Sequence, residues 1–310
     1  MTCASIGPIR AYNVRLDASA SVSGLPPLTG IMGCVDALRR QFAGDDPANA
    51  ASGPDVLIVL HDVQVQPGRF KPSPNHKAAP TEVQETMEGT VEFTLIVRGL
   101  EVSGARAARA LVGKRFCGGN LVLLPAALRD RDGADPANIL SSLPPGRALL
   151  DRRHLLESDL PGDPLNRILH YLTWVPTDPD EGSEASVRMQ DGDSREHNGL
   201  AAAKDADGQN SGKTEKPDKK PELRRPEPGW LVPIAVGYQA LESYDENRFR
   251  SGTRDPDTPH LFVEDLIGLG ELVSTRTLAR RLRAGLGQDG IFWKWRVDLA
   301  RGEFLVTARA

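Results

Sequence analysis

Residues 176–228 separate the sequence into two parts and limit how the chain can fold. This segment is rich in Asp, Ser, Gly, Lys and Pro, holds thirteen acidic and nine basic residues, and has few β-branched or aromatic side chains. It cannot bury enough apolar surface to offset the entropy lost on ordering, so we expect a flexible acidic linker or insertion. Dense apolar sequence resumes abruptly at "GWLVPIAVGYQAL" (229–241).

The part before this linker has the periodicities of alternating strands and helices. Segments 9–23, 55–66 and 83–99 are predicted to be strands, the last with apolar residues alternating from Val91 to Val97. Segments 24–42 and 105–116 are predicted to be helices, and a glycine-interrupted strand follows at 117–125. Two successive β-α-β units predict an α+β, ferredoxin-like body of the RNA-recognition-motif type.

The remaining segments complete this body in our interpretation. Residues 67–80 ("PGRFKPSPNHKAAP") are basic and proline-rich, and are expected to form an extended arm. The residues after 229 show few helical patterns, so we expect one or two returning strands that finish the first sheet. The predicted organisation is therefore a body at 1–175, a linker at 176–228 and a completing segment at 229–310.

Several classes of protein are disfavoured by the sequence. No apolar run approaches the ~20 residues of a membrane span, and the first residues lack a signal pattern, so a cytoplasmic protein without membrane contacts is expected. Cys3, Cys34 and Cys117 have no metal spacing and fit a reduced compartment. No HExxH, GxSxG or paired Cys/His motif is present. His61 and His154 are expected to be structural, and we expect no catalytic residue, metal or cofactor.

Two features suit an RNA ligand. Glycines at 24–30, 118–119 and 268–270 are expected in loops or tight turns that let backbone approach a ribose-phosphate chain. Three arginines in "ENRFRSGTRD" (246–255) would form a basic loop. From the residues alone, solvated loops with surface glycines are the more economical interpretation.

Motifs along the chain then add a family resemblance. The stretches that carry it are "GWLVPIAVGYQAL" (229–241), "RDPDTP" (254–259), "FVEDLIGLGE" (262–271), "GLPPLTGIMGCVDAL" (24–38), "RFCGGN" (115–120) and "PPGRALLDR" (144–152). In this order they resemble the second Csy subunit of type I-F CRISPR surveillance complexes, the Cas-five-type member of the repeat-associated RNA-binding superfamily. The sequence departs from that pattern before residue 24 and at Asp36, which suggests a variant of the system.

The resemblance implies a non-catalytic subunit of a crRNA-guided complex that targets DNA (Cascade). It also implies that the extended arm at 67–80 is a thumb-like projection that folds over the guide. Such a subunit binds and caps the 5′ handle of the crRNA, contacts the large subunit and the first backbone subunit, and meets target double-stranded DNA through the complex. The residues expected to bind RNA are Gly24, Pro26, Thr29, Arg69, Lys71, Arg115, Gly118, Gly119, Tyr238, Arg248, Arg250, Arg254, Gly268 and Gly270. The alternatives are a crRNA-processing endoribonuclease of the same superfamily and a generic single-stranded RNA-binding module.

Overall fold

The computed structural model describes residues 2–19, 21–43, 54–66, 70–72, 83–157, 163–173, 175–176, 223–224, 229–243, 249 and 257–308. The chain divides into two compact units, one formed by residues 1–168 with 229–310 and the other by residues 169–228. Most of the predicted arm and most of the predicted linker lie outside the described residues. Their predicted extended and flexible character therefore stays a prediction.

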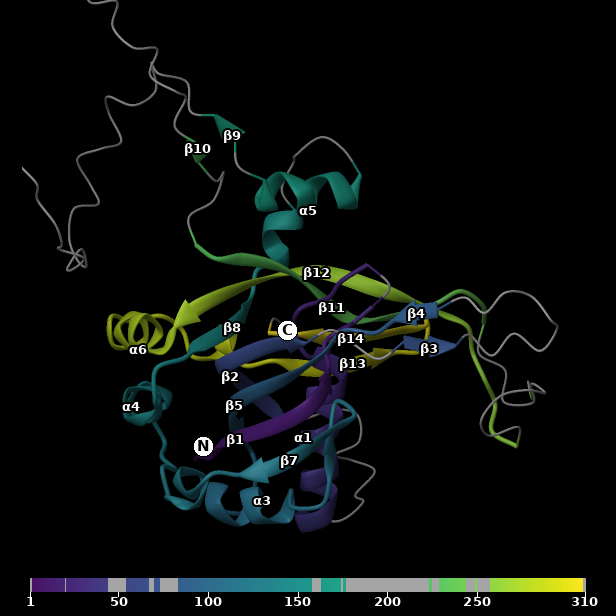
Figure 1. Cartoon of the computed structure of the whole chain (residues 1–310). Coiled ribbons are helices and arrows are strands. Elements are labelled where there is room, and N and C mark those ends of the chain that lie inside the picture. Colours follow the sequence, from purple (N-terminus) through teal and green to yellow (C-terminus); the bar gives the residue numbers. More distant parts are fainter. Residues whose placement is uncertain are drawn as a thin grey trace, which may run out of the picture. The chain divides into compact units, whose positions relative to one another are not determined.

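The first unit is built on a ten-stranded sheet with the strand order β13-β14-β11-β12-β8-β2-β5-β1-β7-β6 (Figure 1). Neighbouring strands pair antiparallel throughout this sheet. The strands are β1 (Cys3–Arg15), β2 (Asp55–Gln66), β5 (Glu88–Arg98), β6 (Arg115–Phe116), β7 (Gly119–Leu123), β8 (Arg147–Asp151), β11 (Leu231–Ala240), β12 (Val263–Ser274), β13 (Lys294–Asp298) and β14 (Glu303–Thr307).

Helices and short ribbons complete the described elements. The helices are α1 (Leu28–Ala43), α3 (Gly104–Ala110), α4 (Pro136–Ser142), α5 (Pro164–Leu172) and α6 (Thr275–Arg283), with 3-10 turns at Pro125–Leu128, Arg153–Glu157 and Asp289–Ile291. The hairpin of β2 and β5 continues into a ribbon of β3 (Phe70–Pro72) and β4 (Val83–Glu85). In the second unit, β9 (Val175–Pro176) pairs with β10 (Leu223–Arg224). The molecule is thus α+β.

Helices α1 and α3 cover one face of the sheet. The apolar stripe of α1, including Ile31, Val35 and Leu38, is buried in the same core as Phe93 of β5 and Phe116 of β6. The rings of Phe93 and Phe116 stack with their centroids 4.1 Å apart. The predicted amphipathic face of α1 is therefore confirmed, and burying it against the sheet is its main source of stability.

Helices α4 and α6 cover the other face. Ile139 and Leu140 of α4 and Leu278 of α6 are buried in a second core with Phe292. Beside it, the buried indole of Trp293 donates a 2.7 Å hydrogen bond to the carbonyl of Leu149 in β8. With apolar cores on both faces, β2 and β5 bury consecutive residues, which explains their long apolar runs.

Three of the predicted elements need correction. The first strand spans Cys3–Arg15, so it starts before the predicted residue 9 and ends before the predicted residue 23. The second helix ends at Ala110, because Leu111 already bonds back to Ala108 in a tighter turn and the predicted end at 116 belongs to β6. The segment after 229 supplies four strands of the sheet and the regular helix α6. Within the described residues, no helix is both long and apolar enough to cross a membrane.

Candidate nucleic-acid interface

The carboxyl end of β1 and the loop after it form the first part of the candidate site. Arg15 ends β1, and its Nε lies 2.9 Å from Oδ1 of Asp17 while the arginine side chain stays 63% exposed. The backbone N–H of Gly24 donates to the carbonyl of Leu16 at 2.8 Å, which closes the loop. The chain then enters α1 at Leu28. A cation, a closed loop and a helix start are therefore adjacent.

The tip of the β6–β7 hairpin lies against the same loop. Cys117 and Gly118 occupy the turn with φ values of 46° and 83°, the pair of left-handed residues that a tight two-residue hairpin requires. The Arg15 N–H donates to the Cys117 carbonyl at 2.9 Å, and the Cys117 thiol faces Pro27 and Gly30 at the start of α1. Burial, with a smaller contribution from Cys34, raises the pKa of Cys117 to about 12. The thiol is therefore protonated at neutral pH, and it packs against the start of α1.

Tyr238 of β11 forms the third part of the candidate site, although it is far from the other parts in sequence. Its hydroxyl lies 3.2 Å from Oγ1 of Thr29 in the first turn of α1, across 209 residues of sequence. The pKa of Arg15 is raised, chiefly by its hydrogen bond to Asp17, with a smaller electrostatic contribution from Tyr238. We call Arg15, Gly24, Thr29, Gly118 and Tyr238 the Thr29–Tyr238 surface.

Aromatic side chains extend from this surface across neighbouring strands. The Tyr238 ring lies 6.3 Å from that of Phe304 on β14, and Phe304 lies 5.8 Å from Trp295 on β13. All three are half-buried. Sequence reasoning missed Phe304 and Trp295, and it also missed Arg15. The paired tryptophans of "FWKW" were a local signal, but only the strand pairing places Trp295 in this row.

The structure brings together several residues that were predicted to bind RNA. Gly24, Thr29, Gly118 and Tyr238 share the Thr29–Tyr238 surface, and Arg115 is exposed two residues before the Cys117–Gly118 turn. Pro26 and Gly119 belong to the same segments but are buried. A Cβ on Gly119 would lie 2.6 Å from the Tyr12 carbonyl, so this glycine serves close packing of β7 on β1.

The prediction that residues 268–270 form a glycine loop is wrong. Gly268 and Gly270 lie inside β12 and are buried. A Cβ on Gly268 would lie 2.8 Å from Cδ of Arg153, and one on Gly270 would lie 2.9 Å from Cδ1 of Leu149. Both glycines therefore make room for side chains that cross β12, and neither offers exposed backbone.

Other predicted residues cannot be placed. Arg69, Arg248, Arg250 and Arg254 lie outside the described residues. For Lys71 the structure describes only the backbone, in β3. These residues stay predictions.

His61 has a structural environment. Its Nε2 lies 2.8 Å from Oγ1 of Thr94, its Nδ1 lies 3.1 Å from the Pro145 carbonyl, and burial lowers its pKa. Thr94 faces away from the core under α1, because its neighbours Phe93 and Leu95 point into that core. His61 and Tyr238 thus lie on opposite faces of the sheet and do not converge.

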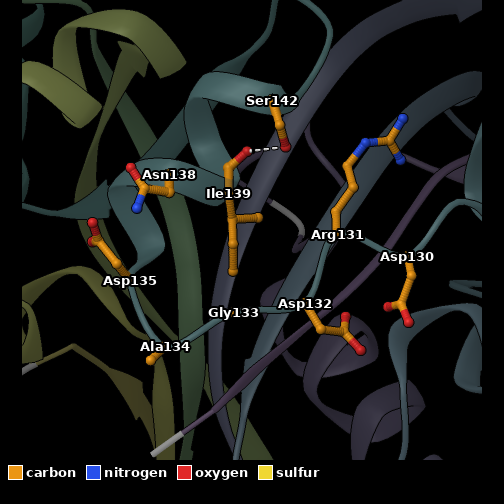
Figure 2. A pocket seen from close by; sticks show the side chains of 9 residues that line it. All are labelled: Asp130, Arg131, Asp132, Gly133, Ala134, Asp135, Asn138, Ile139 and Ser142. Atoms are coloured by element: carbon orange, nitrogen blue, oxygen red, sulfur yellow. Dashed lines mark hydrogen bonds between the residues drawn. The ribbon is translucent and has the colours of Figure 1, made fainter.

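A pocket of about 360 Å³ lies beside α4 and the turn that precedes it (Figure 2). Several of its polar groups bond to backbone. Asp132 accepts from the N–H groups of Ser5 and Gly104, Asp135 caps α4, and Arg131 donates to the Ala126 carbonyl at 2.8 Å. These three side chains therefore hold the turn in place. Among the described residues, no His, Cys, Asp and Glu side chains group as a metal site would require.

The structure is that of an α+β protein in which the start of α1, the tip of the β6–β7 hairpin and strand β11 meet near the carboxyl end of β1. A family model described as CRISPR-associated protein (Cas_Csy2) matches residues 103–306, more than half of the 310 residues. The chain therefore belongs to the Csy2 family of CRISPR-associated proteins. It is also similar to CRISPR-associated protein Csy2 of Pseudomonas aeruginosa (strain UCBPP-PA14), with 50% identity over 56 residues, which span 18% of this chain and 17% of that protein.

Proposed function

We propose that this protein is a non-catalytic subunit of a crRNA-guided, DNA-targeting complex and that it binds the 5′ handle of the guide at the Thr29–Tyr238 surface. Family membership supports a role in a CRISPR system. The observation that carries the choice of site is the convergence of Gly24, Thr29, Gly118 and Tyr238 beside the exposed guanidinium of Arg15. In this proposal the large and backbone subunits flank the same RNA.

The strand order supports a ferredoxin-like unit within the large sheet. β7, β1, β5 and β2 are neighbours in that order and run antiparallel. α1 connects β1 to β2 and α3 connects β5 towards β7, so each helix joins two strands that have a third strand between them. This connectivity supports the split β-α-β arrangement of RNA-recognition folds. We propose that β8, β11, β12, β13 and β14 extend this unit.

The chemistry of the surface suits a single-stranded ligand. Arginine and backbone N–H groups bind phosphates, while hydroxyls and half-buried rings contact splayed bases and 2′-hydroxyls. Thr29 and Tyr238 supply hydroxyls, Arg15 and Arg115 supply charge, and the Gly118 turn exposes backbone. The proposed role requires binding and positioning of RNA and no bond cleavage.

The test is equilibrium binding of the purified full chain to labelled repeat RNA across a range of salt concentrations. Arg15→Ala should lower the log–log salt slope by about 0.7, the value for one single-strand phosphate, and weaken binding about threefold at 0.2 M salt. Arg10→Ala is the matched control, because Arg10 lies on the same strand, is also partly exposed and also pairs with a carboxylate, that of Glu92. Equal effects of the two substitutions would contradict the proposal that RNA binds at the Thr29–Tyr238 surface.

A second experiment tests the predicted basic loop, whose three arginines lie outside the described residues. Replacing Arg248, Arg250 and Arg254 by Ala should lower the salt slope by about 2.1 if each contacts a phosphate. An unchanged slope would indicate that the predicted arm with Arg69 and Lys71, and not this loop, supplies the phosphate contacts. Cleavage of the repeat RNA that disappears in His61→Ala would overturn the non-catalytic role and support the endoribonuclease.

A further inference from the structure

Helix α6 presents an exposed row of arginines. Arg276, Arg280 and Arg283 follow one another at spacings of four and three residues, so they share one side of the helix and span roughly 10 Å of its axis. The side with Leu278 and Ala279 is buried in the core that α6 shares with α4. The row is therefore held on a packed element and faces solvent.

The charge of this row is not neutralised by the described residues around it. Arg281 approaches the buried carboxylate of Glu271 at 3.7 Å, and Arg283 donates to Ser141 at 2.8 Å. Arg276 and Arg280 make no ion pair with a described residue. The sequence from 272 to 288 contains four arginines and no acidic residue. Two guanidinium groups are thus available for an external anion.

Stabilisation of the helix does not account for Arg276. Cations in the last turn interact favourably with the helix dipole, which explains Arg280, Arg281 and Arg283. Arg276 lies in the first turn, where a cation is unfavourable and where α6 has no acidic residue. The helix dipole therefore does not explain Arg276.

The row is remote from the Thr29–Tyr238 surface along the sheet. Tyr238 pairs with Asp265 near the start of β12, and α6 begins after Ser274 at the other end of that strand. The nine residues between them correspond to about 30 Å of strand. A short RNA handle bound at one site therefore leaves the other free for a different nucleic-acid segment.

We propose that the Arg276–Arg280–Arg283 row binds the phosphate backbone of double-stranded DNA. The exposed side of α6 carries arginines and no aromatic residue. Single-stranded ligands are typically bound by cations together with stacking rings, whereas a duplex hides its base faces and offers phosphates at regular intervals. The choice of DNA over duplex RNA rests on the proposed function in a DNA-targeting complex. The contact is independent of sequence and positions the duplex on the protein.

The experiment measures binding of the full chain to a labelled 30-base-pair DNA duplex of arbitrary sequence as salt is varied. The double variant Arg276→Ala/Arg280→Ala should lower the log–log salt slope by about 1.8 and weaken binding roughly 20-fold at 0.2 M salt. The variant Arg276→Lys/Arg280→Lys should retain most of the binding, because lysine also contacts phosphate as a point charge. Arg109→Ala/Arg129→Ala is the matched control, since it removes two exposed arginines elsewhere and should leave the slope nearly unchanged.

Each outcome decides the proposal. Duplex binding that is equal in the double variant and the parent overturns it, as does an equal loss in the Arg109→Ala/Arg129→Ala control. A loss confined to single-stranded RNA, or to assembly with other subunits while duplex binding persists, assigns the row to another partner and also overturns it. Binding of repeat RNA by the double variant, measured in parallel, reports separately on the proposed handle site. Thermal unfolding of every variant confirms that its fold is intact.

Discussion

Asp151 holds the end of β8 to the last strand of the chain. Its carboxylate is buried, accepts hydrogen bonds from Thr307 Oγ1 and the Ala308 N–H at 3.1 Å each, and pairs with Arg153 at 3.1 Å. Burial opposes ionisation of Asp151, but the hydrogen bonds and the positive charge of Arg153 outweigh it and lower the pKa. The charged form is therefore the one that the folded state favours.

Asp151→Ala should lower the free energy of unfolding by about 3 kcal/mol at pH 7, because it leaves the Arg153 guanidinium without its buried partner. A lowered pKa in the folded state means that this contribution is present above the unfolded value near 4 and is lost as pH falls below it. Denaturant unfolding of parent and variant at pH 7 and pH 3 measures the difference. The control Asp298→Ala removes an exposed pair with Arg301 and should cost well under 1 kcal/mol; similar costs for both would contradict the argument.

Substitutions at Gly33 and Gly118 distinguish the effect of backbone conformation on stability from the effect of the space available for a side chain. A Cβ on either residue would meet no atom within 4 Å, but Gly118 has a φ of 83° whereas Gly33 lies inside α1. Gly118→Ala should therefore cost about 1 kcal/mol of unfolding free energy, and Gly33→Ala should add about 0.5–1 kcal/mol. Equilibrium unfolding of the two variants tests the opposite signs. If both shift stability in the same direction, the left-handed turn is not the determinant at Gly118.

At the scale of elements, α6 depends on the cap that β12 provides. The Ser274 hydroxyl accepts a hydrogen bond from the Thr277 N–H at 3.1 Å and satisfies one of the free donors of the first turn. Ser274→Ala should cost about 1 kcal/mol and speed amide exchange in that turn. Ser21→Ala, at an exposed serine of the loop before α1, is the control. Unchanged exchange at the start of α6 would show that packing on α4 alone sustains the helix.

At the scale of the whole molecule, strands from both sides of residues 169–228 belong to one sheet. β8 pairs with β12 over five residues, from Arg147–Ser274 to Asp151–Gly270, and also with β2. A protease site inserted between residues 200 and 210 should therefore yield two fragments that remain associated in gel filtration and unfold in one transition. Separation of the fragments without denaturant would contradict the single-sheet organisation.

Local patterns predicted the elements well. The apolar spacing of Ile31, Val35 and Leu38 predicted the buried side of α1, and alternation from Val91 to Val97 predicted β5. These patterns succeed because the side chains that face the core under α1 repeat with the period of the element itself. Gly268 and Gly270 were misassigned for a related reason: a glycine in a turn and a glycine under a crossing side chain look alike in sequence. Arg153, which needs that room, is more than a hundred residues away.

The sequence by itself determined the kinds of most elements and, through its motifs, the resemblance to a Csy subunit. The tertiary structure alone decided the order and register of ten strands, and with them the meeting of Thr29 and Tyr238 and the exposed placement of the α6 arginines. The physical reason is that periodic burial is encoded within a few residues of chain. Strand partners are chosen by packing and backbone hydrogen bonds between residues that are far apart in sequence, so no local pattern specifies them.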